Sequence, residues 1–260
     1  SVEMLRPDVY IKGGDYTVER LSSRRIVESY GGKVVLTSHI PMQSTTAIID
    51  KIMQRVEPEV RTTSIDIDPY DSRPAVFLDR DGTINEHVDY LHQPERYRIL
   101  PGALEAIREM REAGFRIVVI TNQPGIGTGY FSKDDFFKVN KKLLEEASAR
   151  GVAFDRIFFC PHSKGDNCNC RKPKPAMIER AIRELNIDRR GSFVIGDMTS
   201  DIEAARRAGI KSILVKTGRG GTDQLYDVVP DYIVSDLQSA AEIVTLNQYS
   251  RSVELLPAEI

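Results

Sequence analysis

The chain has 260 residues and a formal net charge of -2, and its composition, 41% hydrophobic and 28% charged, is that of an ordinary globular protein. Nucleic acid and anionic membranes bind to concentrated basic surface, which a charge near zero does not provide, so we expect neither partner. The longest apolar run, FRIVVI at 115–120, is too short to span a bilayer, so the default expectation is a cytoplasmic protein.

The first 56 residues have the pattern of two strand-helix units. We expect strands at 9–14 and 33–38, a polar helix near 19–30, and a second helix that begins at the cap-like Ser44. The following stretch, EPEVRTTSIDIDPYDSRP, loses this periodicity and gains Pro and Asp, which is typical of a linker. The predicted organisation is a partial domain at 1–56, a linker at 57–74, a main domain at 75–245 and a C-terminal tail at 246–260.

Within the main domain, apolar strands alternate with helical segments. The expected strands are 75–79, 116–121, 156–160, 192–197, 211–217 and 232–234, and the expected helices are 101–113, 132–150, 174–185 and 199–208. This alternation predicts an α/β fold, a parallel sheet with helices on both faces. In such sheets the active site lies beyond the carboxyl ends of the strands.

Polar residues follow four of these strands, in the stretches FLDRDGTIN, VITNQPG, CRKPKP and VIGDMTSD. Asp79 and Asp81 stand two residues apart, and Gly82 permits a sharp turn after them. Two carboxylates that close repel each other unless a cation lies between them. The DRDG stretch alone is equally typical of a capping Asp followed by a turn. A catalytic site is favoured because four more polar residues are expected at the same edge of the sheet: Thr121, Lys172, Asp197 and Asp201.

All three cysteines lie within eleven residues, beside one of the four histidines. Cys160, His162, Cys168 and Cys170 form the pattern C-x-H-x5-C-x-C, a ligand set that suits tetrahedral Zn²⁺. A loop with incidental thiols is the alternative, but neighbouring Asp and Asn residues make this loop too polar to bury cysteines for packing. Four protein ligands leave no open position, so the predicted zinc is structural and holds the loop that ends in Arg171 and Lys172.

The motifs DxDGT, TN, RKP and GDxxxD, in this order, resemble those of the haloacid-dehalogenase-like phosphohydrolases over about the C-terminal 180 residues. The resemblance implies a Rossmann-like fold. It also implies that Asp79 attacks phosphorus to form an aspartyl-phosphate. Asp81 would protonate the leaving alkoxide and then activate the hydrolytic water.

The same resemblance implies a catalytic Mg²⁺ that neutralises phosphate charge. Its ligands would be Asp79, the backbone carbonyl of Asp81, and Asp197. Thr121 and Lys172 would stabilise the transferring phosphoryl group, and Asp201 would orient Lys172.

The CPH loop closed by CxCRKP narrows the resemblance to the zinc-containing branch of the family, which has no large cap domain. This branch acts on D-glycero-D-manno-heptose 1,7-bisphosphate or on histidinol phosphate. The stretches FLDRDGTINEHVDYLH, TNQPGIGTGYF and CRKPKPAM favour the heptose substrate, a small phosphorylated sugar, with release of its 7-phosphate. The implied substrate-binding residues are Arg80, His87, Tyr90, Asn122, Gln123 and Arg171.

Three stretches of the N-terminal region, RPDVYIKGGDY, YGGKVVLT and STTAIIDKI, resemble the end of the cytidylyltransferase-like domain of ADP-heptose synthases. This resemblance favours the β-anomer of the heptose. The nucleotide-binding HxGH motif of that domain does not occur in the chain, so we do not expect nucleotide transfer. A partial sheet exposes unpaired edges, which predicts possible self-association through this region. Histidinol-phosphate phosphatase and a non-catalytic scaffold are the remaining alternatives.

Overall fold

A computed structural model describes residues 9–13, 23–37, 59–60 and 71–254, and the chain divides into two compact units, residues 1–56 and 57–260. In the first unit, β1 (Val9–Gly13) pairs in parallel with β2 (Lys33–Thr37), and α2 (Arg24–Ser29) precedes β2. These elements match the two expected strands and the first expected helix. The helix expected from Ser44 lies outside the described residues.

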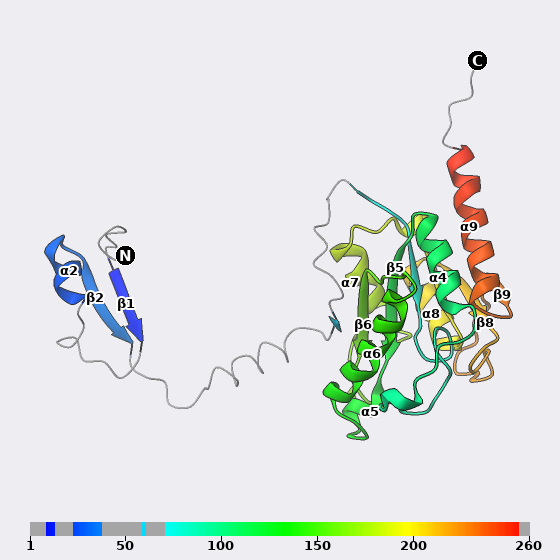
Figure 1. Cartoon of the computed structure of the whole chain (residues 1–260), viewed down its shortest axis with the longest axis horizontal. Helices are drawn as coiled ribbons and strands as arrows, with labels where there is room; N and C mark the ends of the chain where they lie inside the picture. Colours follow the sequence, from blue (N-terminus) through cyan, green and yellow to red (C-terminus); the bar gives the residue numbers. More distant parts are fainter. Residues whose placement is uncertain (1–8, 14–22, 38–58, 61–70, 255–260) are drawn as a thin grey trace, which may run out of the picture. The chain divides into compact units, whose positions relative to one another are not determined.

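The second unit is built on a seven-stranded sheet with the order β3-β6-β5-β4-β7-β8-β9 (Figure 1). Six strands are parallel: β4 (Ala75–Leu78), β5 (Arg116–Asn122), β6 (Arg156–Cys160), β7 (Phe193–Gly196), β8 (Lys211–Val215) and β9 (Tyr232–Val234). This confirms the predicted α/β fold. The short strand β3 (Glu59–Val60) pairs antiparallel with β6, although it lies in the segment expected to be a linker.

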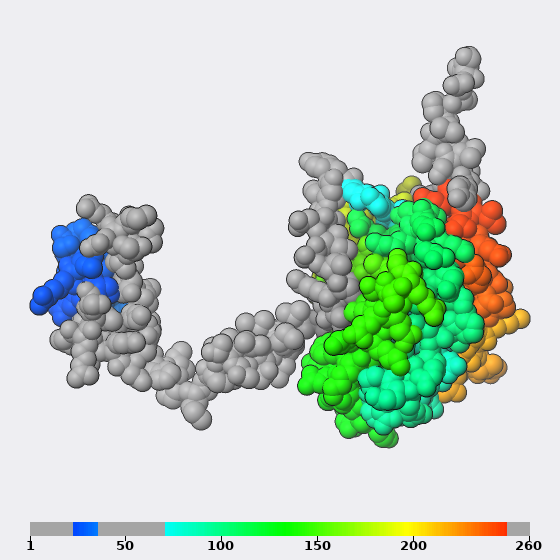
Figure 2. Space-filling model, viewed as in Figure 1, coloured from blue at the N-terminus to red at the C-terminus, as the bar shows by residue number. Residues whose placement is uncertain are grey.

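Helices cover both faces of this sheet, because successive residues of each buried strand point to opposite sides. In β4, Val76 and Leu78 belong to one apolar core, whereas Ala75 and Phe77 belong to the other. The first core is completed by α4 (Ala103–Glu112), α6 (Lys133–Ser148) and α9 (Leu237–Glu254), and the second by α7 (Ala176–Glu184) and α8 (Thr199–Ala208). Figure 2 shows α4 and α6 covering one side of this unit, with α9 beside them.

The shorter helices of this unit lie in the connections between these elements. They are α5 (Pro124–Gly127), η2 (Pro94–Arg96), η3 (Lys164–Asp166) and η4 (Arg189–Gly191). Between β5 and β6 the described chain carries only α5 and α6, in agreement with the expectation that no large cap is present. The edge of the sheet beyond β4, β5 and β7 therefore stays accessible.

The C-terminal helix α9 was not expected from the sequence, which predicts a tail from residue 246. The helix runs through that boundary to Glu254 and packs on α4. Its buried residues include Ala240, Ala241 and Val244, and small side chains allow two helices to approach closely. Among the described residues, no helix is both long and apolar enough to cross a membrane.

Candidate active site

The two aspartates after β4 lie on a tight turn that only glycine can complete. Gly82 has a positive φ of 87°, and a Cβ at this position would overlap the carboxylate of Asp197, which follows β7. The backbone N–H of Arg80 donates to Asp79 Oδ1 at 2.7 Å and fixes that carboxylate at the end of the strand. The DxDG stretch therefore brings Asp79 and Asp197 to the same point, as the sequence predicts.

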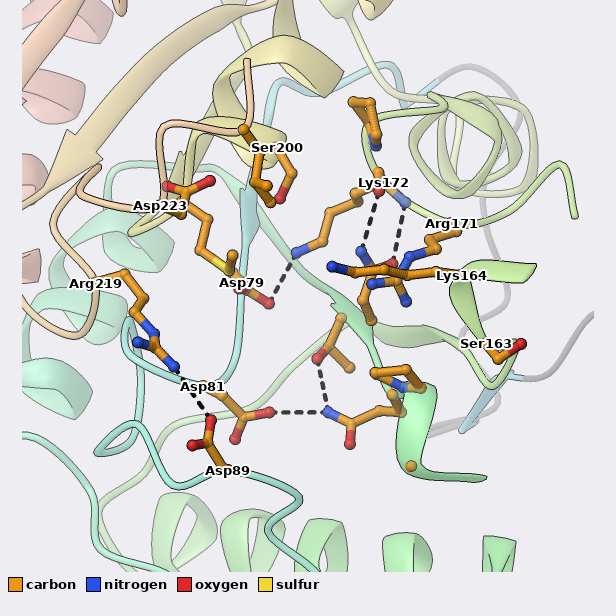
Figure 3. Close-up of a pocket in the computed structure, with 18 of the residues that line it drawn as sticks. Asp79, Asp81, Asp89, Ser163, Lys164, Arg171, Lys172, Ser200, Arg219 and Asp223 are labelled. Carbon is orange, nitrogen blue, oxygen red and sulfur yellow. Dashed lines mark hydrogen bonds and ion pairs between the residues drawn. The ribbon is translucent and has the colours of Figure 1, made fainter. Parts of the chain in front are cut away.

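Three carboxylates and one ammonium group, which we call the carboxylate cluster, consist of Asp79, Asp197, Asp201 and Lys172. Oxygen atoms of the three carboxylates lie within 4.8 Å of one another. The Lys172 Nζ atom lies 2.9 Å from Asp79 Oδ1 (Figure 3). It also lies 2.6 Å from Asp201 Oδ1 and donates to the backbone oxygen of Ile120. The ammonium group thus bridges two acids that would otherwise repel each other.

Burial and like charge dominate the pKa values in this cluster. Burial, with the charges of Asp79 and Asp201, raises the pKa of Asp197 to about 8. Burial also raises the pKa of Asp201 to about 6, although the charge of Lys172 opposes this. For Lys172, burial alone would lower the pKa, but the charges of Asp201 and Asp79 outweigh it and raise the pKa. With all three carboxylates ionised and Lys172 protonated, the cluster has a net charge of -2, so it lacks two positive charges.

Asp197 carries the clearest sign of a missing cation. Its Oδ1 atom is buried and has no hydrogen-bond partner among the described residues. Its Oδ2 atom accepts from the backbone N–H of Arg219 at 2.6 Å. Because a buried carboxylate oxygen is costly without a partner, this donor set fits a hard divalent cation such as Mg²⁺.

Asp81 is held by a separate group of donors. Arg80 Nη2 lies 2.8 Å from Asp81 Oδ2, Asn85 Nδ2 donates to Oδ1 at 2.9 Å, and Gln123 Nε2 donates to Oδ2 at 2.9 Å. Burial alone would raise the pKa of Asp81, but the charge and hydrogen bonds of Arg80, with those of Asn85 and Gln123, lower it. In this arrangement Asp81 is a carboxylate.

Arg80, expected to bind substrate, lies away from the cavity. Its side chain is fully buried, with the guanidinium carbon 5.3 Å from the centre of the Phe136 ring. The residues that line the cavity do not include it. The structure therefore corrects this expectation: Arg80 supports Asp81 from behind, because its charge is balanced by that carboxylate.

Residues at the end of β5 connect the site to the loop that carries Lys172. Thr121 Oγ1 accepts a hydrogen bond from Gln123 Nε2 at 2.9 Å. Asn122 binds the backbone of Lys172 on both sides, accepting from its N–H at 3.0 Å and donating to its carbonyl oxygen at 3.2 Å. Asn122 thus fixes the position of Lys172 while its side chain also lines the cavity.

A cavity of about 870 Å³ opens over these groups, large enough for a phosphorylated sugar. It brings together the following residues predicted from the sequence: Asp79, Asp81, His87, Tyr90, Thr121, Asn122, Gln123, Arg171 and Lys172. It also contains charged residues that the sequence did not single out, among them Lys164, Arg219 and Asp223 (Figure 3).

The loop after β8 is the main part of the site that sequence reasoning missed. Thr217 Oγ1 donates to the backbone oxygen of Gly82 at 2.6 Å, and a Cβ at Gly218 would overlap the Asp197 carboxylate. The side chain of Arg219 lies 3.2 Å from Asp89 at the rim of the cavity. A strand followed by TGRGG, with three glycines at positive φ, was the available signal for a loop that approaches other backbone closely.

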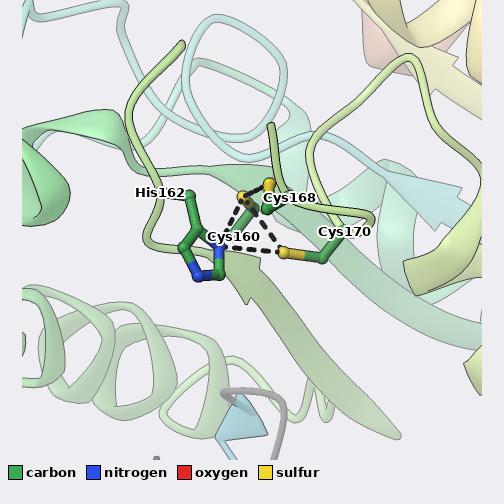
Figure 4. A group of neighbouring side chains, drawn as sticks. All are labelled: Cys160, His162, Cys168 and Cys170. Atoms are coloured by element: carbon green, nitrogen blue, oxygen red, sulfur yellow. Dashed lines mark hydrogen bonds between the residues drawn. The ribbon is translucent and has the colours of Figure 1, made fainter. Parts of the chain in front are cut away.

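The four predicted zinc ligands form a second group, which we call the thiol cluster: Cys160, His162, Cys168 and Cys170. Their ligand atoms face one another (Figure 4), with Cys160 Sγ 3.6 Å from Cys168 Sγ and 3.3 Å from Cys170 Sγ. His162 Nδ1 lies 3.2 Å from Cys170 Sγ. The hydrogen bond with Cys160, with smaller contributions from His162 and Cys168, lowers the pKa of Cys170 to about 6, whereas the same contact and burial raise the pKa of Cys160.

Comparisons with known proteins agree with this geometry. Residues 169–240 match the HAD-hydrolase-like family. The D-glycero-beta-D-manno-heptose-1,7-bisphosphate 7-phosphatase of Pasteurella multocida (strain Pm70) is 42% identical over 158 residues, which cover 58% of this chain and 86% of the relative. The D-glycero-D-manno-heptose-1,7-bisphosphate 7-phosphatase of Chlorobaculum tepidum is 40% identical over 193 residues, which cover 68% of this chain and 97% of the relative.

A solved structure has the same fold. The D,D-heptose 1,7-bisphosphate phosphatase from B. bronchiseptica, in complex with magnesium and phosphate, superposes with a TM-score of 0.62 at 33% identity. The match covers 66% of this chain and 98% of that protein. These comparisons confirm the haloacid-dehalogenase-like assignment.

Proposed function

Because the chain belongs to the D-glycero-D-manno-heptose-1,7-bisphosphate 7-phosphatase family of HAD-like hydrolases, we propose that it hydrolyses the 7-phosphate of this sugar bisphosphate, with the β-anomer favoured. The observation that carries the proposal is the cavity in which Asp79, Asp81, Thr121 and Lys172 meet. Its place is the synthesis of ADP-heptose for lipopolysaccharide. The cytoplasmic location and self-association through residues 1–56 stay predictions.

Asp79 is the nucleophile in this proposal. Its carboxylate attacks phosphorus, and the bond between phosphorus and the sugar oxygen breaks as the aspartyl-phosphate forms. Lys172, 2.9 Å from Asp79, stabilises the negative charge that develops on the phosphoryl oxygens during the attack. Asp201 holds the other side of the Lys172 ammonium, and Thr121 offers a hydroxyl to the same phosphoryl group.

Asp81 handles the protons in both halves of the reaction. It gives a proton to the leaving sugar oxygen, and it later takes one from the water that attacks the aspartyl-phosphate. Its position between Arg80, Asn85 and Gln123 favours the second role, because these donors stabilise the carboxylate form. For the first role, a protonated Asp81 has to turn from these donors towards the leaving group.

The residues present fit two metal ions. Asp79, Asp197 and the backbone carbonyl of Asp81 would hold Mg²⁺, which supplies neutralising charge for the phosphate group. The thiol cluster would hold a structural Zn²⁺, since it offers three sulfurs and one imidazole nitrogen and no ligand position for substrate. This proposal keeps the two ions in separate roles.

Substrate recognition would involve the walls of the cavity. His87 and Tyr90 stand on the loop after the DxDG turn, and Arg171 precedes Lys172. Asn122 and Gln123 reach the cavity while bound to Lys172 and Asp81, so their contribution is orientation as well as contact.

The test is phosphate release with Mg²⁺ from the α- and β-heptose bisphosphates and from histidinol phosphate, compared as kcat/KM. We expect a preference of about a hundredfold for a heptose bisphosphate, or about 2.7 kcal/mol of transition-state binding. Preference for histidinol phosphate would reject the proposed substrate. Absence of turnover with all three would favour the scaffold alternative.

A further inference from the structure

The proposed reaction leaves one phosphate group on the sugar, and that group needs its own binding site. A phosphate dianion in a partly enclosed cavity is stabilised by charge-assisted hydrogen bonds from Lys and Arg side chains that are free to bind it. Lys172 cannot serve, because it is already bound to Asp79 and Asp201 at the reacting end. The remaining basic residues of the cavity are Lys164, Arg171, Lys174, Arg207 and Arg219.

Three of these five already have partners in the chain. Lys174 Nζ donates to the backbone oxygen of Cys168 at 2.5 Å, and Arg207 Nε lies 2.7 Å from Glu203 Oε1. Arg219 pairs with Asp89 across the rim at 3.2 Å. An incoming phosphate would have to compete with these partners for the same cationic groups.

Lys164 and Arg171 differ from them. Within the described part of the chain, the Lys164 ammonium has neither a hydrogen bond nor an ion pair. The guanidinium of Arg171 makes one long hydrogen bond, 3.4 Å, to the backbone oxygen of His162. Figure 3 shows both side chains on one side of the cavity, with Arg219 on the opposite side.

The backbone that carries Lys164 is fixed, although its side chain is exposed. Lys164 begins the short helix η3, where the N–H of Ser163 donates to Asp166 Oδ2 at 2.7 Å. The helix lies between His162 and Cys168 of the thiol cluster. A lysine at this place is therefore presented from a defined position, and only its side chain has to order when an anion binds.

We infer that Lys164, together with Arg171, binds the phosphate group that is not transferred, and that Lys164 is a residue that determines the preference for a bisphosphate over a monophosphate. This inference rests on the proposed function. It also gives the thiol cluster a part in specificity, because the same four ligands that hold the loop set the distance between Lys164 and the reacting end at Asp79.

The experiment compares the zinc-loaded, Mg²⁺-supplied wild type with Lys164→Met and Lys164→Arg, on the heptose bisphosphate and on p-nitrophenyl phosphate. We expect Lys164→Met to lower kcat/KM for the bisphosphate about tenfold more than for the aryl phosphate, mainly through KM. Lys164→Arg keeps the positive charge and should retain most of the preference. Equal losses on both substrates, or a bisphosphate KM equal to that of the wild type, would overturn the inference.

Lys141→Met is the matched control, because Lys141 lies on α6 with a side chain that is 77% exposed, outside the cavity lining. It removes the same charge and should change neither KM. If the wild type does not hydrolyse heptose bisphosphates, the proposed substrate fails. The role of Lys164 is then measured through inhibition of p-nitrophenyl phosphate hydrolysis by fructose 1,6-bisphosphate and fructose 6-phosphate. A tenfold weaker inhibition by the bisphosphate alone in Lys164→Met supports the role, and equal weakening for both sugars rejects it.

Discussion

The carboxylate cluster and the thiol cluster both follow strands of one sheet, but they differ in how their ligand atoms are arranged around a cation. The carboxylate cluster contains its own cation, Lys172, and still leaves Asp197 Oδ1 without a partner in the described structure. In the thiol cluster, the four ligand atoms contact one another and enclose the place of an ion. The carboxylate cluster has hard oxygen ligands and a charge that is only partly balanced, which suits ligands that bind and leave, such as phosphate. The thiol cluster is a closed set of soft ligands, which suits a permanently bound ion.

The largest effect is expected from a change of Asp79 in the carboxylate cluster. Asp79→Asn keeps the shape of the side chain but removes the nucleophile, so kcat should fall by more than about 10³-fold. Phosphate release is the measurement, with thermal unfolding to check that the fold is intact. Asp134→Asn, at an exposed position on α6, is the control and should keep full activity. Substantial turnover by Asp79→Asn would remove the covalent mechanism.

Cys170→Ser tests the structural role of the thiol cluster. Removing one ligand of a closed site should release zinc and lower the free energy of unfolding by more than about 4 kcal/mol, because loss of a metal is one of the few causes of effects this large. Metal analysis after dialysis and chemical denaturation measure these two effects. Asn169→Ser changes an exposed neighbour in the same loop and should leave both unchanged. Wild-type protein with less than about half an equivalent of zinc would contradict the structural role.

The smallest effect expected is a pH dependence of stability in protein freed of Mg²⁺. The pKa of Asp197 is raised to about 8 and that of Asp201 to about 6, so between about pH 4 and pH 8 the folded protein binds more protons than the unfolded chain. Stability should therefore fall as pH rises through this window.

Excess Mg²⁺ should reduce this slope, because the cation stabilises the ionised carboxylates. Asp81 acts outside the window, since its pKa is lowered and its stabilising effect is lost only in acid. Thermal unfolding at pH 5 to 8, with and without Mg²⁺, is the measurement. A melting temperature that rises with pH in the metal-free protein would contradict the sign.

The sequence predicts the convergence of the site well, because each strand end carries a short polar motif and parallel strands place their carboxyl ends together. Asp79, Thr121, Lys172 and Asp197 could be found in this way. Arg80 could not be placed correctly from the sequence, because a charged residue beside two aspartates is expected to be exposed. Its burial depends on Phe136, which is distant in the sequence. Contacts of this kind follow from packing rather than from local pattern.

Other misses have a similar cause. Lys164 lies within the C-x-H-x5-C-x-C pattern and Arg219 lies within TGRGG, but neither pattern indicates that these side chains line the cavity, so only the fold reveals this role. The helix α9 escaped notice because its contact with α4 relies on alanines, which give a weak apolar signal. The strand β3 has only two residues, too few for any periodicity to appear.

That two-residue strand has a consequence for handling the protein. Glu59–Val60 covers the outer side of β6, the strand that leads into Cys160. A shortened protein that starts at residue 71 would retain every catalytic group but would leave β6 as a bare edge, ready to join a strand of another molecule. Such a version should begin with full activity and lose it on storage through aggregation, so the useful starting point for a shortened enzyme lies before residue 59.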